Sequence, residues 1–590
     1  MRFTHSPSQQ PLTPLPPRRR PADLARALLI ATLLLMTGAA AGAEEGFRQP
    51  SQSLTQLIDA PANPWVIETP DGNGLMVIDR PSLPAIDELA EPELRLAGLR
   101  INPRIDTRSR ERYGSGLSYI RLEDGGTRQI EGLPADLRWN GFDFSPDGSK
   151  VALTHVAEDR AELWIADLET FKAHRLIDRA LHLVAGNRPA WLDDSTLVAT
   201  LVPENRAAPP QPPRVPRGPV VRENLGVKAQ ARTYQDLLAN PHDEALFAHH
   251  MSAQIARIGL DGSVEALGEP ALVWDVEPSP DGRFLLVQTL QRPFSYLVPA
   301  FRFARTVEIL DRDGQRVAQL AKLPLAESVP LAYGSVPTGL RSASWRHDAP
   351  ATVAWAEAQD GGDAGSEAEI RDRLFMLAAP FEAEPTPWVD LALRYAGTTW
   401  GHDGLALITS SWWQTRQVQV HWAQPGQPDA EPSLVVERSF EDRYGDPGSP
   451  LTVTGKFGRP VLQHPKGQPA VLYLAGNGAS PEGDRPFLDR HDLESGEKTR
   501  LFRSEAPYFE LPIAVLEGDE SLLTRRESVD EPPNYRVREL DGDASRAVTR
   551  FPHPAEQLAG VQKELVTYPR EDGVQLSATL YLPAGYDAER

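Results

Sequence analysis

Residues 142–153 read Phe-Asp-Phe-Ser-Pro-Asp-Gly-Ser-Lys-Val-Ala-Leu, and residues 276–287 repeat the pattern as Val-Glu-Pro-Ser-Pro-Asp-Gly-Arg-Phe-Leu-Leu-Val. Pro fixes φ near −65° at the second position of a turn, and Asp and Gly tolerate the left-handed backbone that can follow. Apolar residues lie on both sides of each Pro-Asp-Gly, in the pattern of β-strands. Each stretch therefore predicts a β-hairpin with Pro-Asp-Gly at its turn.

Weaker versions of the same turn recur along the chain. Each places polar turn residues directly before an apolar run, and the seven turns lie near residues 147, 194, 281, 348, 403, 466 and 519. Successive turns are 47 to 87 residues apart, whereas a four-stranded propeller blade needs roughly 40–50 residues. We therefore expect a mainly β chain with a seven-bladed β-propeller and a central tunnel over residues 105–558. The longest step leaves room for an eighth blade.

The composition indicates one large β domain with additional segments. The chain has 590 residues, 41% of them hydrophobic, with 55 Pro and 44 Gly, which is too long for one small core. The net charge of −21 argues against nucleic acid as a partner, because phosphate binding needs clustered cationic side chains. Cys is absent, which excludes disulfides and thiolate metal sites. No motif indicates a cofactor.

The first 43 residues have the pattern of a signal peptide. A basic segment contains Arg18, Arg19, Arg20 and Arg26, and the apolar run of residues 27–36 follows it. Ala41-Gly42-Ala43 fits a cleavage site before Glu44. The apolar run is far shorter than the ~20 residues of a membrane span. We expect export to the periplasm or the medium and no membrane span after cleavage, with an uncleaved anchor as the alternative.

Two further segments fall outside the repeated pattern. Residues 44–104 carry apolar side chains at helical spacing, at 54–58 and 86–99, and we expect an N-terminal extension there. Residues 203–250 predict an insertion, because seven prolines between Pro203 and Pro219 are incompatible with a central strand. Asn240-Pro241 then divides residues 234–247 into two short helical pieces around a turn.

The C-terminal residues have a different character. Residues 565–582 predict one more hairpin, whose second strand alternates Val574, Leu576, Ala578, Leu580 and Leu582 with other residues. Residues 572–586 fit Asp-Gly-x-x-Leu-x-Ala-x-Leu-Tyr-Leu-Pro-x-Gly-Tyr. A propeller followed by this hairpin resembles the prolyl oligopeptidase family of serine peptidases, in which the hairpin opens the α/β-hydrolase domain. Residues 99–103, 113–117, 232–238, 293–296 and 524–528 resemble its glutamyl endopeptidase-like branch.

The resemblance implies an exported serine peptidase that acts on peptides or unfolded proteins, with the propeller restricting access to the active site. The family's nucleophile lies in a Gly-x-Ser-x-Gly elbow, which this sequence lacks; Ser115 and Ser480 come nearest but do not fit. The Asp and His of the triad would follow the Ser, so we assign no catalytic residue. We expect residues 559–590 to begin a truncated peptidase domain, and the chain to be inactive alone.

Candidate binding residues follow from the same resemblance. An enzyme that cleaves after Glu needs a cationic group for the substrate carboxylate, best as a bidentate guanidinium contact. The candidates that flank expected strand ends are Arg416, Arg443, Arg525 and Arg526. An alternative hypothesis is a non-enzymatic propeller that binds a protein or peptide, although the hairpin after the repeat argues against it. The sequence leaves the oligomeric state open.

A group of histidines offers a possible metal site. His242, His249 and His250 lie close to Asp243 and Glu244, and metal sites use these residue types. We interpret the group as a solvated helical insertion and expect no metal there.

Overall fold

The computed structural model describes residues 50–215, 233–516, 518–542 and 544–587. The expected signal peptide, with its cleavage site between Ala43 and Glu44, lies outside these residues. The chain divides into two units, residues 1–58 and 59–590. The described part of the first unit contains α2 (Gln52–Ile58), at the position where apolar spacing predicts a helix. None of the described helices is long and apolar enough to span a membrane.

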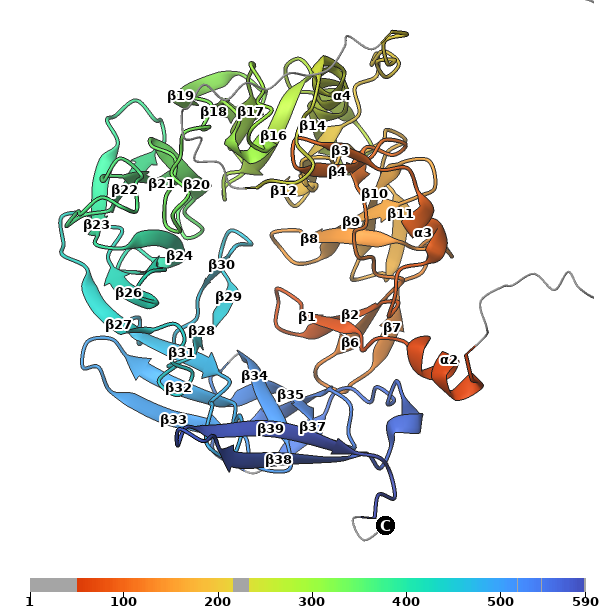
Figure 1. Ribbon diagram of the computed structural model, residues 1–590, viewed down its shortest axis with the longest axis vertical. Helices are drawn as coiled ribbons and strands as arrows, with labels where there is room; N and C mark the ends of the chain where they lie inside the picture. The colour runs from red at the N-terminus through yellow and green to blue at the C-terminus, as the bar shows by residue number, and fades with distance from the viewer. Residues whose placement is uncertain (1–49, 216–232, 517, 543, 588–590) are drawn as a thin grey trace, which may run out of the picture. The chain divides into compact units, whose positions relative to one another are not determined.

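Residues 59–590 are mainly β, and their antiparallel sheets follow one another around a ring (Figure 1). The first sheet contains β1 (Trp65–Glu68), β2 (Gly74–Asp79), β6 (Gly116–Arg121) and β7 (Thr127–Gln129). The second contains β8 (Trp139–Phe144), β9 (Lys150–Val156), β10 (Ala161–Asp167) and β11 (Lys172–Arg175).

An eight-stranded sheet comes next. Its first half contains β12 (Ala190–Asp193), β13 (Thr196–Leu201), β14 (Ser252–Gly259) and β15 (Val264–Ala266). Its second half contains β16 (Ala271–Pro278), β17 (Phe284–Leu290), β18 (Arg305–Asp311) and β19 (Arg316–Leu323). The halves are joined only where Ser252 and Ala253 of β14 pair with β16.

Four more four-stranded sheets complete the ring. Two of them contain β20 (Leu340–Trp345), β21 (Thr352–Ala358), β22 (Asp372–Ala378) and β23 (Thr386–Leu391), then β24 (Arg394–His402), β25 (Leu405–Trp412), β26 (Gln417–Ala423) and β27 (Ser433–Ser439). The last two contain β28 (Ser449–Pro450), β31 (Val471–Gly476), β32 (Phe487–Asp492) and β33 (Lys498–Arg503), then β34 (Phe509–Val515), β35 (Ser521–Glu527), β36 (Asn534–Glu539) and β37 (Ser545–Ala547).

The ring is held by side-chain packing between neighbouring sheets. The first and last sheets share a core in which Leu75 and Val77 of β2 pack with Leu523 of β35. The first and second sheets share another, with Met76 and Leu153. Burying such side chains stabilises the fold by roughly 1.5–3 kcal/mol each. The chain therefore brings its first and last sheets together without pairing their strands.

Six of the seven predicted turns join strands that pair with each other. The turn at residue 466 instead joins β30 to β31, which belong to different sheets, so no hairpin forms there. In the first predicted turn, Asp147 accepts hydrogen bonds from Ser145 Oγ at 2.6 Å and Ser149 N at 2.9 Å, which fixes the turn locally. Turns of successive sheets also meet, because Asp147 N donates to Asp194 at 2.8 Å. The first sheet has a turn of the same kind at residues 69–72, Thr-Pro-Asp-Gly, which the sequence analysis missed.

The expected N-terminal extension is not separate from the sheets. β1 and β2 pair with each other, and β2 pairs with β6 along its whole length. The boundary expected at residue 104 therefore divides one sheet. Only α3 (Ile86–Ala90) is helical in the second apolar stretch, and Leu94 and Leu99 lie in strands; β3 (Leu94–Leu96), β4 (Leu99–Asn102) and β5 (Thr107–Arg108) form a small sheet.

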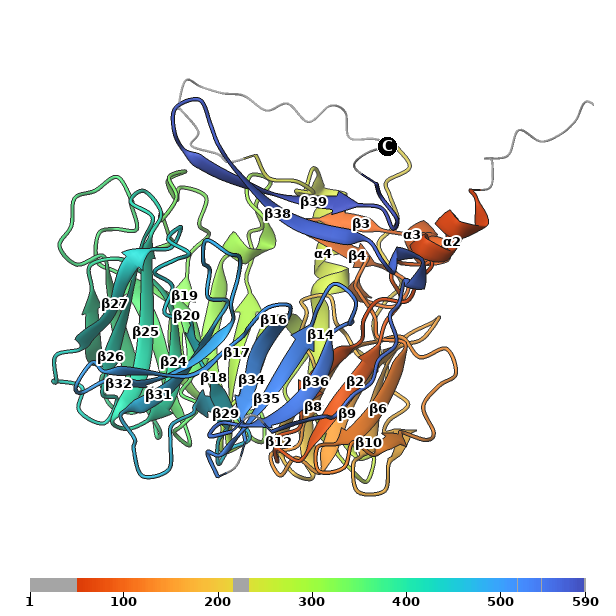
Figure 2. The same ribbon diagram turned by 90° about the horizontal axis from the view of Figure 1, so that it is seen from below.

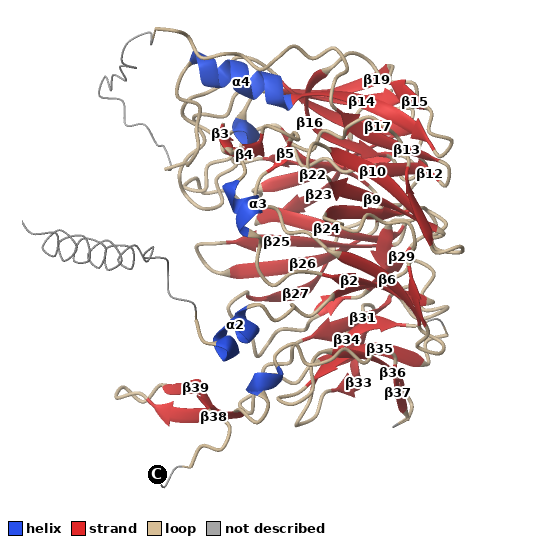
Figure 3. Cartoon of the chain, turned by 90° about the vertical axis from the view of Figure 1, so that its right-hand side faces the viewer, coloured by secondary structure: helices blue, strands red, loops and turns tan. Residues whose placement is uncertain are grey.

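Among the described residues of the insertion there is one helix, where two helical pieces were expected around Asn240-Pro241. α4 (Pro241–Met251) begins directly after Asn240, whose side chain accepts hydrogen bonds from the backbone of His242 and Asp243. Asn240-Pro241 is thus a helix start, with an N-cap residue followed by Pro at N1. Residues 233–239 are not helical, and Asp236 among them has φ of 58°. Figure 3 shows α3 and α4 on the same side of the sheets as β3 and β4.

A short hairpin lies across the middle of the ring in Figure 1. It consists of β29 (Thr452–Thr454) and β30 (Pro460–Leu462). Arg459 at its tip donates to the Pro278 carbonyl oxygen at 3.1 Å, and the Pro460 carbonyl oxygen lies 3.0 Å from His347 Nδ1. The tip therefore contacts sheets that are distant from its own along the ring.

The predicted C-terminal hairpin is present. β38 (Gln562–Pro569) and β39 (Gln575–Leu582) pair in register, from Gln562 with Leu582 to Pro569 with Gln575. Leu565, Val574 and Leu580 are 43–45% exposed, so the apolar face of the hairpin is largely uncovered within this chain. Figure 2 shows the hairpin on the side of the ring where β3 and β4 lie. The 3-10 helix η2 (Glu556–Leu558) precedes it, and η1 (Ala300–Arg302) precedes β18.

Candidate functional site

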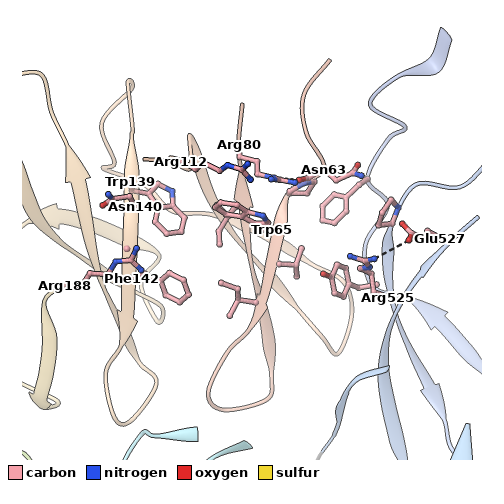
Figure 4. Close-up of a pocket in the computed structure, with 18 residues that line it drawn as sticks. Asn63, Trp65, Arg80, Arg112, Trp139, Asn140, Phe142, Arg188, Arg525 and Glu527 are labelled. Atoms are coloured by element: carbon pink, nitrogen blue, oxygen red, sulfur yellow. Dashed lines mark hydrogen bonds and ion pairs between the residues drawn. The ribbon is translucent and has the colours of Figure 1, made fainter. Parts of the chain in front are cut away.

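A cavity of about 700 Å³ lies where the first, second and last sheets meet. Trp65 starts β1, Trp139 starts β8, and Arg525 and Glu527 lie on β35. Figure 4 shows Arg80 beside Arg112, with Arg188 and Arg525 on opposite sides of the cavity. We call this cavity, lined by these four arginines, the arginine pocket.

Arg80 is held in place at the margin of the arginine pocket. Its Nε donates to the Asn63 carbonyl oxygen at 2.9 Å, and its guanidinium carbon lies 4.8 Å from the centre of the Trp65 ring. A cation over an aromatic face is attracted by the ring quadrupole. The contact orients Arg80 without neutralising its charge.

The arginine pocket carries an excess of positive charge. Four arginines line it against one carboxylate, Glu527, which lies 3.4 Å from Arg525 Nη2. Arg112 and Arg188 are exposed and form no ion pair with any described residue. A chain with a net charge of −21 thus concentrates cations around one cavity. Such a local field attracts anions that the rest of the surface repels.

Two buried N–H groups of residues lining the pocket have no acceptor among the described residues. They are Nε of Arg525 and Nε1 of the Trp139 indole. A buried donor without a partner costs roughly 1–3 kcal/mol, which marks both positions as energetically strained in this structure. Burial also raises the pKa of Tyr535, which lines the same cavity, although Arg525 nearby opposes the shift. Its hydroxyl therefore remains protonated at neutral pH.

This arrangement suits a ligand that offers oxygen acceptors and negative charge. Guanidinium groups bind carboxylates through two parallel N–H···O bonds, which are stronger than neutral hydrogen bonds. The pocket offers guanidinium groups from four different segments around one space. None of the described residues that line it is Ser, Thr, Cys or His, and its positive charge is suited to binding an anion.

The structure brings one of the four sequence-predicted arginines to this pocket. Arg525 lines it, whereas the adjacent Arg526 pairs with Glu531 at 3.1 Å and stacks on Tyr508. Successive residues of a strand face opposite sides, which separates the two arginines.

The other two predicted arginines lie elsewhere. Arg416 pairs with Glu441 at 3.0 Å and lies over Trp413, while Arg443 is 69% exposed beside Asp484. Sequence reasoning missed Arg80, Arg112 and Arg188. For two of them a signal was available, because Arg80 directly follows β2 and Arg188 lies shortly before β12.

The histidines of α4 differ from the expected solvated group. His250 is 1% exposed, and its Nδ1 lies 3.0 Å from Asp106, which Arg206 also contacts at 3.0 and 2.5 Å. Burial alone would raise the pKa of Asp106, but the hydrogen bonds from His250 and Arg206 lower it to about 2. These residues fasten α4 to the small β3–β5 sheet. Among the described residues no group of three or more His, Asp or Glu could hold a metal ion.

Two curated proteins are similar to most of this chain. No family model matches the sequence. A probable chloroplastic glutamyl endopeptidase of Oryza sativa subsp. japonica is 38% identical over 569 residues, which cover 92% of this chain and 61% of that protein. The corresponding protein of Arabidopsis thaliana is 38% identical over 573 residues, covering 92% and 60%. This chain is a relative of these glutamyl endopeptidases.

The resemblance predicted from the sequence is therefore confirmed. This chain of 590 residues spans about three fifths of the length of the curated glutamyl endopeptidases that it matches. Solved structures are more distant. Porphyromonas gingivalis dipeptidyl peptidase 4 is 11% identical with a TM-score of 0.47, covering 92% of this chain and 68% of that one. Pyrococcus horikoshii acylaminoacyl peptidase is 11% identical with a TM-score of 0.41, covering 90% and 59%.

Proposed function

We propose that this chain is the substrate-facing part of a serine-type peptidase that acts on acidic peptides. The observation that carries the proposal is the arginine pocket, with four arginines, one glutamate and two unpaired buried N–H groups. Two curated relatives named as glutamyl endopeptidases support the choice of substrate. In this function the pocket receives the side-chain carboxylate of a substrate Glu, and Arg525 is its principal donor.

The proposal includes a propeller that limits access to the peptidase centre. The sheets fit eight blades if the two halves of the eight-stranded sheet are counted separately. Shared hydrophobic cores between neighbouring sheets support that count, including the core between the last and the first. The exposed hairpin β38–β39 supports the idea that residues 559–590 begin a peptidase domain, against whose sheet the hairpin would pack.

The binding test compares two peptides that differ in charge alone. N-acetylated, C-amidated Ala-Ala-Glu-Ala-Ala-Ala and its Gln counterpart would be titrated calorimetrically into residues 44–590. We expect the Glu peptide to bind at least tenfold more tightly, because charge-assisted hydrogen bonds contribute about 1.5–3 kcal/mol. Arg525→Gln should remove most of this preference. Arg526→Gln, the matched control on the same strand, should keep it; equal binding of both peptides would refute the proposal.

The proposal also holds that residues 44–590 do not hydrolyse peptides by themselves. Acyl transfer in this class needs a Ser activated by a His, with oxyanion donors, and the sequence has no Gly-x-Ser-x-Gly elbow. We expect no labelling by a fluorophosphonate probe and no cleavage of Glu peptides. Stoichiometric labelling of any serine would show that a nucleophile is present.

Export is the remaining part of the proposal. Residues 1–43 would be removed, so that the mature chain begins at Glu44, as the small residues before it favour. The curated relatives are named as chloroplastic, which describes their own location. N-terminal sequencing of material from the extracytoplasmic fraction tests this, and a retained Met1 in the cytoplasmic fraction would contradict it.

A further inference from the structure

A second arginine-rich cavity lies on other sheets, between β17–β19 and β20. It has a volume of about 280 Å³ and is lined by Arg302, Arg305 and Arg341. None of the described residues that line it is Asp or Glu. We call it the Arg302 pocket, and it shares no lining residue with the arginine pocket.

Arg302 has no carboxylate partner among the described residues, and its Nε is buried without an acceptor. Its backbone carbonyl oxygen accepts a hydrogen bond from Ala326 N at 2.9 Å, which holds the loop after β19 in place. The guanidinium carbon of Arg302 lies 5.9 Å from the centre of the Phe301 ring, a contact that orients the side chain without neutralising its charge. An unpaired, partly buried guanidinium is costly, which favours a bound anion.

The other two guanidinium groups are only partly compensated. Burial lowers the pKa of Arg305, although Asp275 nearby opposes the shift, and its Nη1 contacts Gln288 Oε1 at 3.4 Å. Arg341 pairs with Asp372, but Arg394 also contacts that carboxylate at 2.9 Å. The Nε of Arg341 is buried without an acceptor. The pocket therefore presents several donors and a surplus of positive charge.

The remaining walls of the Arg302 pocket are largely apolar. Phe303 is 1% exposed and Leu340 6% exposed, and further apolar lining comes from Leu323, Pro324, Val336 and Pro337. A hydrated inorganic anion would leave these walls without an apolar partner, whereas an apolar molecule would leave Arg302 without an anionic partner. The volume lies just below the roughly 300–1,000 Å³ that is usual for drug-sized ligands.

We propose that the Arg302 pocket binds a small carboxylate with an apolar body, its carboxylate on Arg302 and its apolar part against Phe303 and Leu340. The site is independent of the peptide-binding function proposed above. Its ligand class follows from donors without acceptors at one part of the cavity and apolar walls around the rest.

The test uses hexanoate as the probe, with saturation-transfer NMR titrations against residues 44–590. Hexan-1-ol lacks the charge, acetate lacks the apolar chain, and inorganic phosphate is a hydrated anion. We expect hexanoate to bind at least tenfold more tightly than each of the three. The proposal would be overturned if hexanol, phosphate or acetate bound as tightly as hexanoate.

Variants then assign the binding to this cavity. Arg302→Gln should weaken hexanoate binding at least tenfold, whereas Arg316→Gln, an exposed arginine on β19 that pairs with Glu308, should leave it unchanged. Unaltered hexanoate binding by Arg302→Gln would overturn the assignment. The variant should still bind the Glu peptide, so the two proposals fail separately. If Arg302→Gln does not fold, the comparison of the four probes on the unaltered chain still decides.

Discussion

At the scale of single residues, Glu277 on β16 is expected to make the stability of the fold depend on pH. The pKa of Glu277 is raised to about 7, chiefly by burial; Arg459 and the backbone N–H of Trp345 oppose the shift, and Asp275 adds to it. The ordinary pKa of Glu is 4.5, so the folded state favours the protonated form. This contribution to stability is complete below about pH 4.5 and is lost as the pH rises through 7.

The substitution Glu277→Gln keeps the shape and removes the titration. The hydrogen bond from Trp345 Nε1 goes to the backbone oxygen of Glu277 at 3.0 Å and survives the change. We expect the variant to be more stable by about 2 kcal/mol at pH 8 and nearly unchanged at pH 4.5, as measured by urea unfolding. Glu269→Gln, at an exposed loop position, should behave like the unaltered chain. An unchanged pH dependence in Glu277→Gln would contradict the prediction.

At the scale of elements, Asp106 makes a buried polar contact with α4, beside the apolar packing of Phe247 and Met251. It has φ of 50° and lies between β4 and β5, with His250 and Arg206 on its carboxylate. Its pKa is lowered to about 2, so its contribution is complete above its ordinary pKa of 3.8 and is lost as the pH falls towards 2.

Asp106→Asn should therefore destabilise the fold by about 3 kcal/mol at pH 7, because it leaves a buried guanidinium uncompensated. The difference from the unaltered chain should shrink below pH 3. Chemical unfolding at pH 7 and below pH 3 measures this loss of stability. Faster hydrogen exchange confined to α4 would show that the loss arises at this helix. Asp178→Asn, whose carboxylate is 87% exposed beside Arg175, serves as the control. Equal losses in the two variants would show that the buried contacts do not matter.

At the scale of the whole molecule, the β29–β30 hairpin links distant sheets through Gly458. This residue has φ of 70°, and a Cβ there would lie 2.8 Å from the Cα of Pro146 in the turn of the second sheet. A side chain at Gly458 would thus strain the backbone and push the tip away from its contacts. Gly467 has φ of 75°, and no atom lies within 4 Å of a Cβ added there. A substitution at Gly467 therefore shows the cost of the backbone conformation without any steric contact.

Gly458→Ala should lower stability by about 1 kcal/mol more than Gly467→Ala does. Because the displaced tip also loses the bond from Arg459 to Pro278, proteolysis within residues 452–462 should be faster in Gly458→Ala alone. Thermal unfolding and limited proteolysis measure the two effects. Identical behaviour of the two alanine variants would mean that the hairpin tip does not depend on its contact with Pro146.

The sequence by itself determined the local units of this protein. Pro-Asp-Gly at 146–148 and 280–282 marked turns, because a turn depends on residues within four positions of one another. Alternation in residues 574–582 marked the C-terminal hairpin for the same reason, and the motif at residues 572–586 carried the resemblance to the prolyl oligopeptidase family. Thr-Pro-Asp-Gly at 69–72 carried an equal signal, and treating residues 44–104 as an extension concealed it.

Only the tertiary structure decided where those units meet. The arginine pocket joins Arg80 to Arg525 across more than four hundred positions, because the last sheet packs against the first through Leu75 and Leu523. The residues next to Arg80 and Arg525 in the sequence do not predict that contact. His250 likewise looks like a solvated helix residue until Asp106, 144 positions earlier, is placed against it. Turns are encoded by adjacent residues, whereas sites between sheets depend on how the ring closes.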